Sequence, residues 1–209
     1  MERNRILLVT RTASVVVVVV AIVAQAVELA NHDAFNPTRF FAYFTIQSNL
    51  IGIAAFAWLL ANRGAPRSHA LESFRGAAAA YLTVTFVVVI ALLSNVDVGL
   101  GLVWVDVVLH KLFPVIVVLD WLVDPPTVRL SGRDVVAWMI YPVVWLGLTL
   151  VRGAADGWYP YPFLNPANGG YGSVAITSVV ITIGFLVLAA AYIWLGNRLG
   201  GRRLEAQPA

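Results

Sequence analysis

The sequence contains no cysteine, only one lysine and few charged residues. The absence of cysteine excludes disulfides, thiolate catalysis and cysteine-based metal sites, and it leaves the redox compartment open. Charged residues make up 12% of the 209 residues and hydrophobic residues 60%, whereas a typical soluble domain has about 25% charged residues. This composition indicates an integral membrane protein. The net charge of +3 is therefore interpreted by position along the chain, and not as a signal for nucleic-acid binding.

Six apolar stretches are long enough to cross a bilayer, which takes about 20 helical residues. The first contains the β-branched run VVVVVV, which is expected to be helical because lipid forces every backbone group to bond within its segment. Its start also resembles a signal peptide with AQA at 24–26, but the apolar stretch continues to Ala30, which favours a retained helix. The sequence predicts one all-α domain over residues 1–209, a polytopic membrane protein with a six-transmembrane-helix bundle. Its spans are expected at about 7–30, 40–61, 75–94, 100–122, 134–151 and 173–196.

The arginines predict the orientation of these spans. Basic residues accumulate in cytoplasmic loops, and only Arg39 and Arg152 fall on the side opposite to the majority. Both termini are therefore expected in the cytoplasm, and the excess of arginine over lysine suggests a bacterial cytoplasmic membrane. The arginines on the majority side are Arg3, Arg5, Arg11, Arg63, Arg67, Arg75, Arg129, Arg133, Arg198, Arg202 and Arg203.

Polar residues inside the spans follow helical spacing, so each of four spans presents one polar stripe, and these stripes are expected to converge inside the bundle. Thr45 and His110 lie roughly 8 and 15 Å below the outer boundary at 1.5 Å per residue, which allows contact between them. The stripes are Gln25, Glu28 and His32 on the first span; Phe41, Thr45, Ser48, Asn49 and Gly52 on the second; Asp106, His110, Phe113, Val117 and Asp120 on the fourth; and Trp138, Tyr141, Trp145, Thr149 and Arg152 on the fifth.

Each intramembrane polar group has a structural and a functional interpretation. A charge at mid-bilayer costs about 2.5–3.5 kcal/mol, so Asp106 either forms a structural pair with His110 or Lys111 or serves a site. His110 is a satisfied core histidine, a metal ligand or a general base; no second histidine shares its depth, which disfavours the metal. Thr45 alone is as consistent with interhelical packing as with chemistry. Glu28 and Arg152, both near the outer end, are expected to pair structurally or to contact headgroups.

The longest outer connection, residues 152–172, reads RGAADGWYPYPFLNPANGGYG and is rich in aromatic residues, proline and glycine. Trp and Tyr gather at membrane interfaces, so one interpretation is an aromatic belt at the headgroups. The other is a lid over a cavity that opens outward. The sequence favours neither, and the two are compatible.

Three stretches resemble one family. RFFAYFTIQSNL at 39–50, LHKLFPVIVVLD at 109–120 and GWYPYPFL at 157–164 resemble the androgen-induced gene / FAR-17a-like family of six-span membrane proteins, whose bacterial members are called Pr6Pr proteins. Animal members of that family are intramembrane threonine hydrolases that cleave fatty acid esters of hydroxy fatty acids. The resemblance implies that Thr45 is the nucleophile and His110 the catalytic histidine, and that Asp120 stands at an acidic position of the family.

The resemblance also has departures. Pro114 follows His110 at an offset that differs from that of the animal members, and Asp106 stands where they have a neutral amide.

Asp106, one helical turn before His110, is expected to orient the imidazole, and Asn49 to donate to the oxyanion. No cofactor or metal is expected, and the partners are a lipid ester and membrane lipids. The residues expected to bind substrate are Arg152, Trp138, Tyr141, Trp145, Phe113, Trp158 and Tyr161.

A second class of function stays open. A non-enzymatic six-span protein that binds lipid or transports a small solute would use the same polar stripes to line a path open to both sides. Inverted repeats, common in such transporters, are not evident in the sequence. The distance between Thr45 and His110 discriminates best, because a threonine hydrolase requires these two side chains within hydrogen-bond reach.

Overall fold

A computed structural model describes residues 2–93 and 102–205 of the chain. The chain is 84% helix, and the described residues contain no strand, which confirms the all-α class. Residues 94, 100 and 101, which belong to two predicted spans, lie outside the described residues. The helices are α1 (Glu2–Asn31), α2 (Pro37–Phe40), α3 (Phe44–Ala61), α4 (His69–Val88), the π-helix η1 (Val89–Leu93), α5 (Val103–Val107), the π-helix η2 (Val108–Leu112), α6 (Phe113–Val123), α7 (Gly132–Asp156), the 3₁₀ turns η3 (Pro162–Leu164) and η4 (Pro166–Asn168), and α8 (Gly170–Glu205).

Five helical segments of the described chain are long and apolar enough to cross a membrane. They are Glu2–Asn31, Phe44–Ala61, His69–Leu93, Gly132–Asp156 and Gly170–Gly201, and they coincide with five of the six predicted spans. The remaining span, predicted at 100–122, falls on α5, η2 and α6, which are 5, 5 and 11 residues long. By length and composition, the described residues thus form an all-helical protein with five candidate membrane spans.

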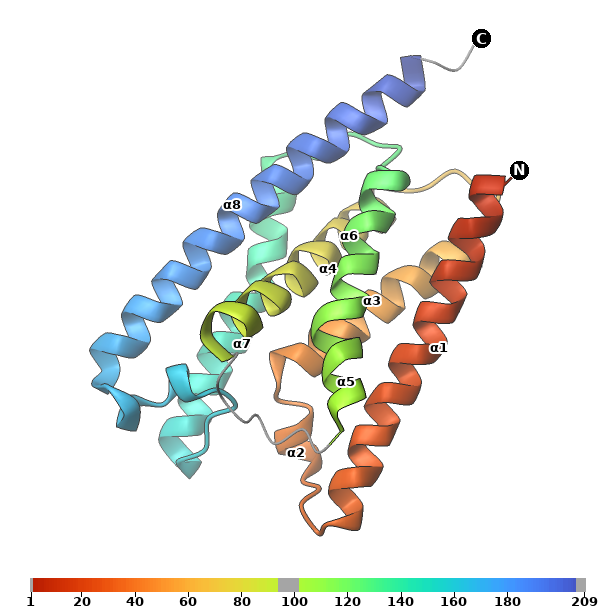
Figure 1. Cartoon of the computed structure of the whole chain (residues 1–209). Helices are drawn as coiled ribbons and strands as arrows, with labels where there is room; N and C mark the ends of the chain where they lie inside the picture. The colour runs from red at the N-terminus through yellow and green to blue at the C-terminus, as the bar shows by residue number, and fades with distance from the viewer. Residues whose placement is uncertain (1, 94–101, 206–209) are drawn as a thin grey trace.

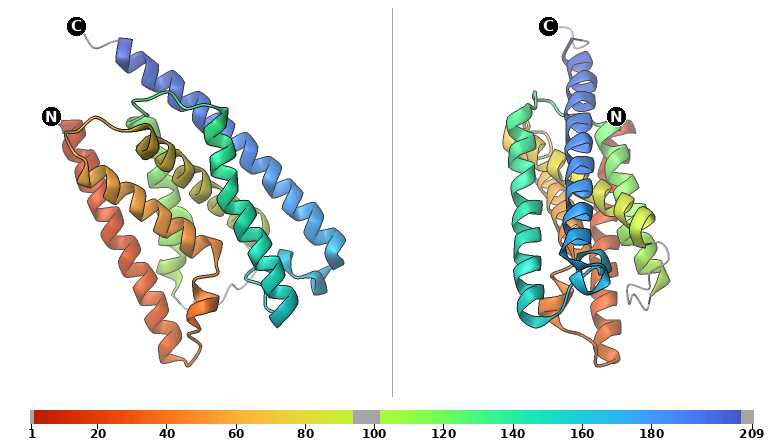
Figure 2. Two further views of the ribbon diagram at one scale, coloured as in Figure 1. Left: turned by 180° about the vertical axis from the view of Figure 1, so that it is seen from behind. Right: turned by 90° about the vertical axis from the view of Figure 1, so that its left-hand side faces the viewer.

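The outward faces of the long helices are apolar. Val136, Val151 and Ile176, on α7 and α8, are 67%, 71% and 68% exposed. An apolar surface of this extent is unfavourable in water and is the surface that a lipid-facing helix presents. The N-terminal end of α1 and the C-terminal end of α8 lie at the same end of the bundle, which we call the terminal end (Figure 1). The view from behind shows α2, η3 and η4 grouped at the opposite end (Figure 2).

The break between α5 and α6 has a local cause. In the π turn the N–H of Phe113 bonds to the carbonyl of Val108, five residues back. Pro114 has no N–H, so the carbonyl of Leu109 lacks a donor at the next position of that register. The side chain of Asn49 on α3 supplies one, with its Nδ2 3.1 Å from the Leu109 carbonyl oxygen. The π turn is therefore fixed to α3 by a side-chain hydrogen bond.

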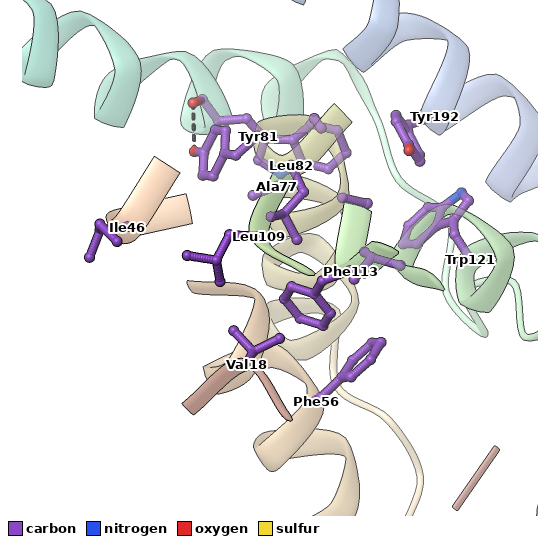
Figure 3. Close-up of a cluster of buried hydrophobic side chains, with 14 of the residues drawn as sticks. Val18, Ile46, Phe56, Ala77, Tyr81, Leu82, Leu109, Phe113, Trp121 and Tyr192 are labelled. Atoms are coloured by element: carbon purple, nitrogen blue, oxygen red, sulfur yellow. Dashed lines mark hydrogen bonds between the residues drawn. The ribbon is translucent and has the colours of Figure 1, made fainter. Parts of the chain in front are cut away.

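Phe113 and Trp138, which the sequence placed in a substrate cavity, lie in the core instead. Phe113 is 1% exposed and packs edge-on against Phe56 at 5.7 Å between ring centroids, and Figure 3 shows it deep among the core side chains. Trp138 lies against Gly76, where a Cβ would collide with its ring, and its Nε1 donates to Ser73 at 3.1 Å. A stripe on one helix shows which side faces inward, and the neighbouring helix decides whether that side meets a cavity or a packed surface.

Asp120 shares the stripe of His110 but has its partners on other helices. It belongs to a buried ionic network near the terminal end, where Arg11 Nε lies 2.7 Å from Asp120 Oδ1 and Arg75 Nη2 lies 3.0 Å from Asp120 Oδ2. The network joins α1, α4, α6 and the segments that follow α3 and α6, and its members are Arg11, Arg67, Glu72, Arg75, Asp120 and Asp124. The hydrogen bonds of Asp120 thus stabilise the fold and do not support His110.

Candidate functional site

Thr45 and His110 meet in the interior, although 65 residues separate them. Thr45 stands in the first turn of α3, which starts after Tyr43, and His110 stands in the π turn η2. The two side chains are 5% and 6% exposed, and Thr45 Oγ1 lies 3.2 Å from His110 Nε2. The hydroxyl is therefore within reach of a base that is shielded from bulk water.

Asp106 binds the other side of the imidazole. Its Oδ1 lies 2.8 Å from His110 Nδ1, and Lys111 Nζ donates to its Oδ2 at 3.2 Å. A 3.6-residue period puts Lys111 on a different side of the helix from Asp106, so the spacing of an α-helix does not favour the pair that the sequence left open. The π turn pairs residues five apart, so both His110 and Lys111 reach the same carboxylate.

Tyr161 completes the contacts of Thr45. The backbone N–H of Thr45 donates to the Tyr161 hydroxyl oxygen at 3.2 Å, and that hydroxyl lies 3.3 Å from Thr45 Oγ1. Burial raises the pKa of Tyr161 to about 12, an effect that its hydrogen bonds to Thr45 only partly offset, so the phenol keeps its proton. The connection between α7 and α8 thus forms a wall of the site, as the lid interpretation requires.

These contacts assign a direction to every proton. The ammonium of Lys111 and the backbone N–H of Thr45 can only donate. Tyr161 then donates to Thr45 Oγ1, Thr45 donates to His110 Nε2, and the Nδ1–H of His110 donates to Asp106. We assign this tautomer from the hydrogen-bond network, in which it satisfies all five side chains.

Asn49 fixes the site and does not point a donor into it. Its Nδ2 donates to the carbonyl of Thr45 at 2.8 Å and to that of Leu109 at 3.1 Å, so both of its N–H groups are engaged. The side chain is 0% exposed. The expectation that Asn49 donates to an oxyanion is therefore replaced by a positioning role between α3 and η2.

A cavity of about 390 Å³ opens beside Thr45 and His110. Gln25 and Arg39 line it, and neither was predicted from the sequence to be a site residue. Gln25 shares the polar stripe of Glu28 and His32, and its position inside an apolar span is the signal that points to it. The lining comprises Gln25, Leu29, Ala34, Asn36, Arg39, Phe40, Tyr43, Thr45, Ile46, Leu93, Leu109, His110, Trp158 and Tyr161.

Arg152 is engaged outside this cavity. It donates to the Thr38 carbonyl at 2.7 Å and to Asp156 at 3.2 Å, and its guanidinium lies over Trp158 at 5.1 Å. It does not pair with Glu28, which contacts His32 at 3.2 Å. Arg39, 5.3 Å from the same Trp158 ring, lines the cavity in its place, and Trp158 lines it too.

A second, apolar cavity of about 100 Å³ lies between α4, α7 and α8. Trp145 lines it, and Tyr161 and Leu93 line both cavities, so they form the wall between the two. Tyr141 lines neither of them; its hydroxyl donates to Gln47 at 2.6 Å. The aromatic residues of the fifth span therefore divide into one cavity residue, Trp145, and two packing residues.

The described residues contain no group of three or more His, Asp or Glu side chains arranged to hold a metal ion. Comparisons of the chain with family models, curated proteins and solved structures gave no match. The family resemblance drawn from the sequence therefore stays a prediction, and a functional proposal for this chain rests on the geometry of the site.

Proposed function

We propose that this protein is an intramembrane hydrolase of lipid esters, with Thr45 as the nucleophile and His110 as the general base. One observation carries the proposal: the Thr45 hydroxyl, the His110 imidazole and the Asp106 carboxylate form an unbroken hydrogen-bonded chain beside a cavity. A nucleophile, a base and a carboxylate that orients the base recur in acyl-transfer enzymes of unrelated fold. A buried threonine that only packs helices requires neither the carboxylate nor the cavity.

The proposed topology has six crossings. α5, η2 and α6 follow one another without a gap from Val103 to Val123, and at 1.5 Å per residue they span about 30 Å, the thickness of the hydrocarbon. With this fourth crossing both termini lie on the same side, which the arginine distribution places in the cytoplasm. The cavity then lies nearer the outer surface, and Lys111 and Asp106 lie within the membrane as a bonded pair.

The proposed reaction has two halves. Thr45 Oγ attacks the ester carbonyl carbon while His110 Nε2 takes its proton, and Asp106 stabilises the imidazolium through Nδ1–H. The intermediate collapses to an acyl-threonine ester, and the leaving alcohol takes the proton from His110. Water then attacks the acyl group with His110 again as base, which releases a carboxylic acid and restores the Thr45 hydroxyl. The sum is one ester and one water to one acid and one alcohol.

The apolar cavity supports acyl esters as the substrate class. It adjoins Tyr161, which touches Thr45, and its lining includes Phe44, Trp145 and Phe185. Such a lining favours hydrocarbon and offers few polar partners. Esters of hydroxy fatty acids, which the family resemblance implies, belong to this class, as do simpler acyl esters.

Activity of the purified protein tests the proposal. In detergent, the wild type is expected to hydrolyse 4-nitrophenyl acyl esters or acyl esters of hydroxy fatty acids, and Thr45→Ala and His110→Ala to lose at least about 10³-fold in kcat. Two matched variants serve as controls: Thr83→Ala removes a threonine bonded to Tyr192 outside both cavities, and His32→Ala removes an exposed histidine. Both are expected to retain wild-type rates. Wild-type rates in Thr45→Ala or His110→Ala would remove this mechanism and favour a lipid-binding or transport protein.

A further inference from the structure

Gln25 is a buried polar side chain of the site whose amide nitrogen and oxygen both lack a partner in the part of the chain that the structure describes, whereas Asn49 lacks one only at Oδ1. It is 1% exposed and lines the same cavity as Thr45 and His110. Neither its Nε2 nor its Oε1 has a hydrogen-bond partner among the described residues. Leaving such a group unpaired destabilises a protein, whereas an apolar side chain of the same shape would not. The position of this unpaired amide on a cavity points to a partner that is present only when a molecule occupies that cavity.

The neighbouring helices bring Gln25 to the same cavity as the reacting groups. α1 packs against α3, which carries Thr45, and against η2, which carries His110. Gln25 lies six residues before the end of α1, about 9 Å inside the helix terminus at 1.5 Å per residue. The apolar side chains of Ile46 and Leu109 line the cavity with it. A hydrogen bond formed in such surroundings is stronger than one formed in water.

Several other donors near Thr45 are already engaged. Both N–H groups of Asn49 bind backbone carbonyls, and the backbone N–H of Thr45 donates to Tyr161. Lys111 is half exposed and bonded to Asp106. Hydrolysis of an ester through a tetrahedral intermediate nevertheless develops a negative charge on the carbonyl oxygen, which requires a donor.

We propose that Gln25 is a catalytic residue whose Nε2–H donates to the ester carbonyl oxygen as it becomes an oxyanion. The inference rests on the proposed function and names a group that it leaves unassigned. When Thr45 Oγ forms its bond to the carbonyl carbon, the π electrons move to the oxygen, and the Gln25 amide stabilises that charge. When the bond to the leaving alcohol breaks, the electrons return to the carbonyl. The amide keeps its own protons throughout.

The test compares oxygen and sulfur at the reacting carbonyl. The wild type and Gln25→Met are assayed with a 4-nitrophenyl acyl ester and with its thionoester, in which C=S replaces C=O. Sulfur accepts hydrogen bonds poorly, so the wild type is expected to prefer the oxygen ester strongly. Gln25→Met is expected to lose about 10²-fold in kcat for the oxygen ester with KM changed less than about 3-fold, and to lose most of that preference.

Thermal stability distinguishes this role from a structural one. Gln25→Met removes an unpaired buried amide, so its Tm is expected to rise above that of the wild type. Gln47→Met is the matched control, because Gln47 accepts from Tyr141 at 2.6 Å and donates to the Phe41 carbonyl at 2.7 Å. Its Tm is expected to fall, and its preference for oxygen over sulfur to stay that of the wild type.

The outcomes separate the two proposals. An active wild type whose Gln25→Met variant keeps both its kcat and its preference for oxygen would overturn the role of Gln25 and leave the hydrolase intact. A wild type that cleaves no ester would overturn both. Loss of kcat in Gln25→Met with an unchanged preference for oxygen and a lowered Tm would assign Gln25 to the fold, and would also overturn the proposal.

Discussion

Lys111 binds Asp106 across five residues because the helix between them is a π turn. The same turn leaves His110 within reach of Asp106 at four residues, so both oxygens of one carboxylate are engaged from one segment. An α-helix would turn Lys111 away from Asp106. The π turn next to Pro114 thus brings both His110 and Lys111 to the Asp106 carboxylate.

Replacing Asp106 by asparagine is expected to lower kcat by about 10³-fold. The amide neither fixes the Nδ1–H tautomer of His110 nor stabilises the imidazolium that forms when Thr45 is deprotonated. Lys111→Met should lower kcat less than about 10-fold, because Lys111 bonds to Asp106 and acts on His110 only through that carboxylate. The measurement is kcat with a 4-nitrophenyl ester. Equal losses in the two variants would show that the ion pair, and not the carboxylate on His110, is the required contact.

Pro114→Ala is expected to reduce activity without a comparable loss of stability. The new N–H can bond to the carbonyl of His110, which favours regular α-helix, and in that helix the N–H of Phe113 competes with Asn49 for the Leu109 carbonyl. In a regular helix Lys111 leaves Asp106 and His110 rotates relative to Thr45, so we expect a loss of roughly 10-fold or more in kcat. Tm and kcat are measured together. A variant with wild-type kcat would show that the π turn has no role in aligning His110.

The ionic network at the terminal end predicts a dependence of stability on acid. Burial raises the pKa of Asp124, but the hydrogen bond from Arg11 and the charges of Arg67 and Arg75 outweigh it and lower the pKa from 3.8 to about 2. A lowered folded-state pKa stabilises the protein above the unfolded-state pKa, and this stabilisation is lost as the pH falls from about 4 to about 2. A shift of this size corresponds to about 2–3 kcal/mol.

Thermal unfolding in detergent between pH 7 and pH 2 measures this effect. The Tm difference between the wild type and Asp124→Asn should be large at pH 7 and shrink below pH 4, because the protonated wild type then also lacks the charge. Comparison with the variant cancels the contribution of the carboxylates outside this network. A difference that stays constant with pH would mean that Asp124 stabilises the fold without its charge.

Gly52→Ala is expected to destabilise the protein by about 1–3 kcal/mol. A Cβ at Gly52 would lie 2.7 Å from Phe113 Cε1 and 2.8 Å from Leu82 Cδ1, so the core between α3, α4 and α6 must shift. Gly147→Ala is the control, since no atom lies within 4 Å of a Cβ built there, and it should stabilise α7 by about 0.5–1 kcal/mol. Thermal unfolding of both variants measures the two effects. A Gly52→Ala variant as stable as the wild type would contradict this packing.

Part of the site follows from helical spacing alone. Asp106 and His110 are four residues apart, a spacing that brings side chains together in an α-helix and, as the structure shows, across the start of the π turn. The depth of Thr45 and His110 in their spans allowed the contact of 3.2 Å that the structure has. The all-helical fold and five of the candidate spans follow from apolar length, because a bilayer admits few other structures.

The partners of the inward-facing residues were decided only by the tertiary structure. Phe113 and Asp120 share the stripe of His110, yet one meets Phe56 and the other meets Arg11 and Arg75. Lys111 gained a role because Pro114 changes the local period, and Gln25 became a candidate because it lines a cavity without a partner. Sequence periodicity determines which face of a helix turns inward. Which neighbour that face meets depends on how helices distant in the sequence pack, and hydrogen bonds and charge pairs between them are fixed only at that stage.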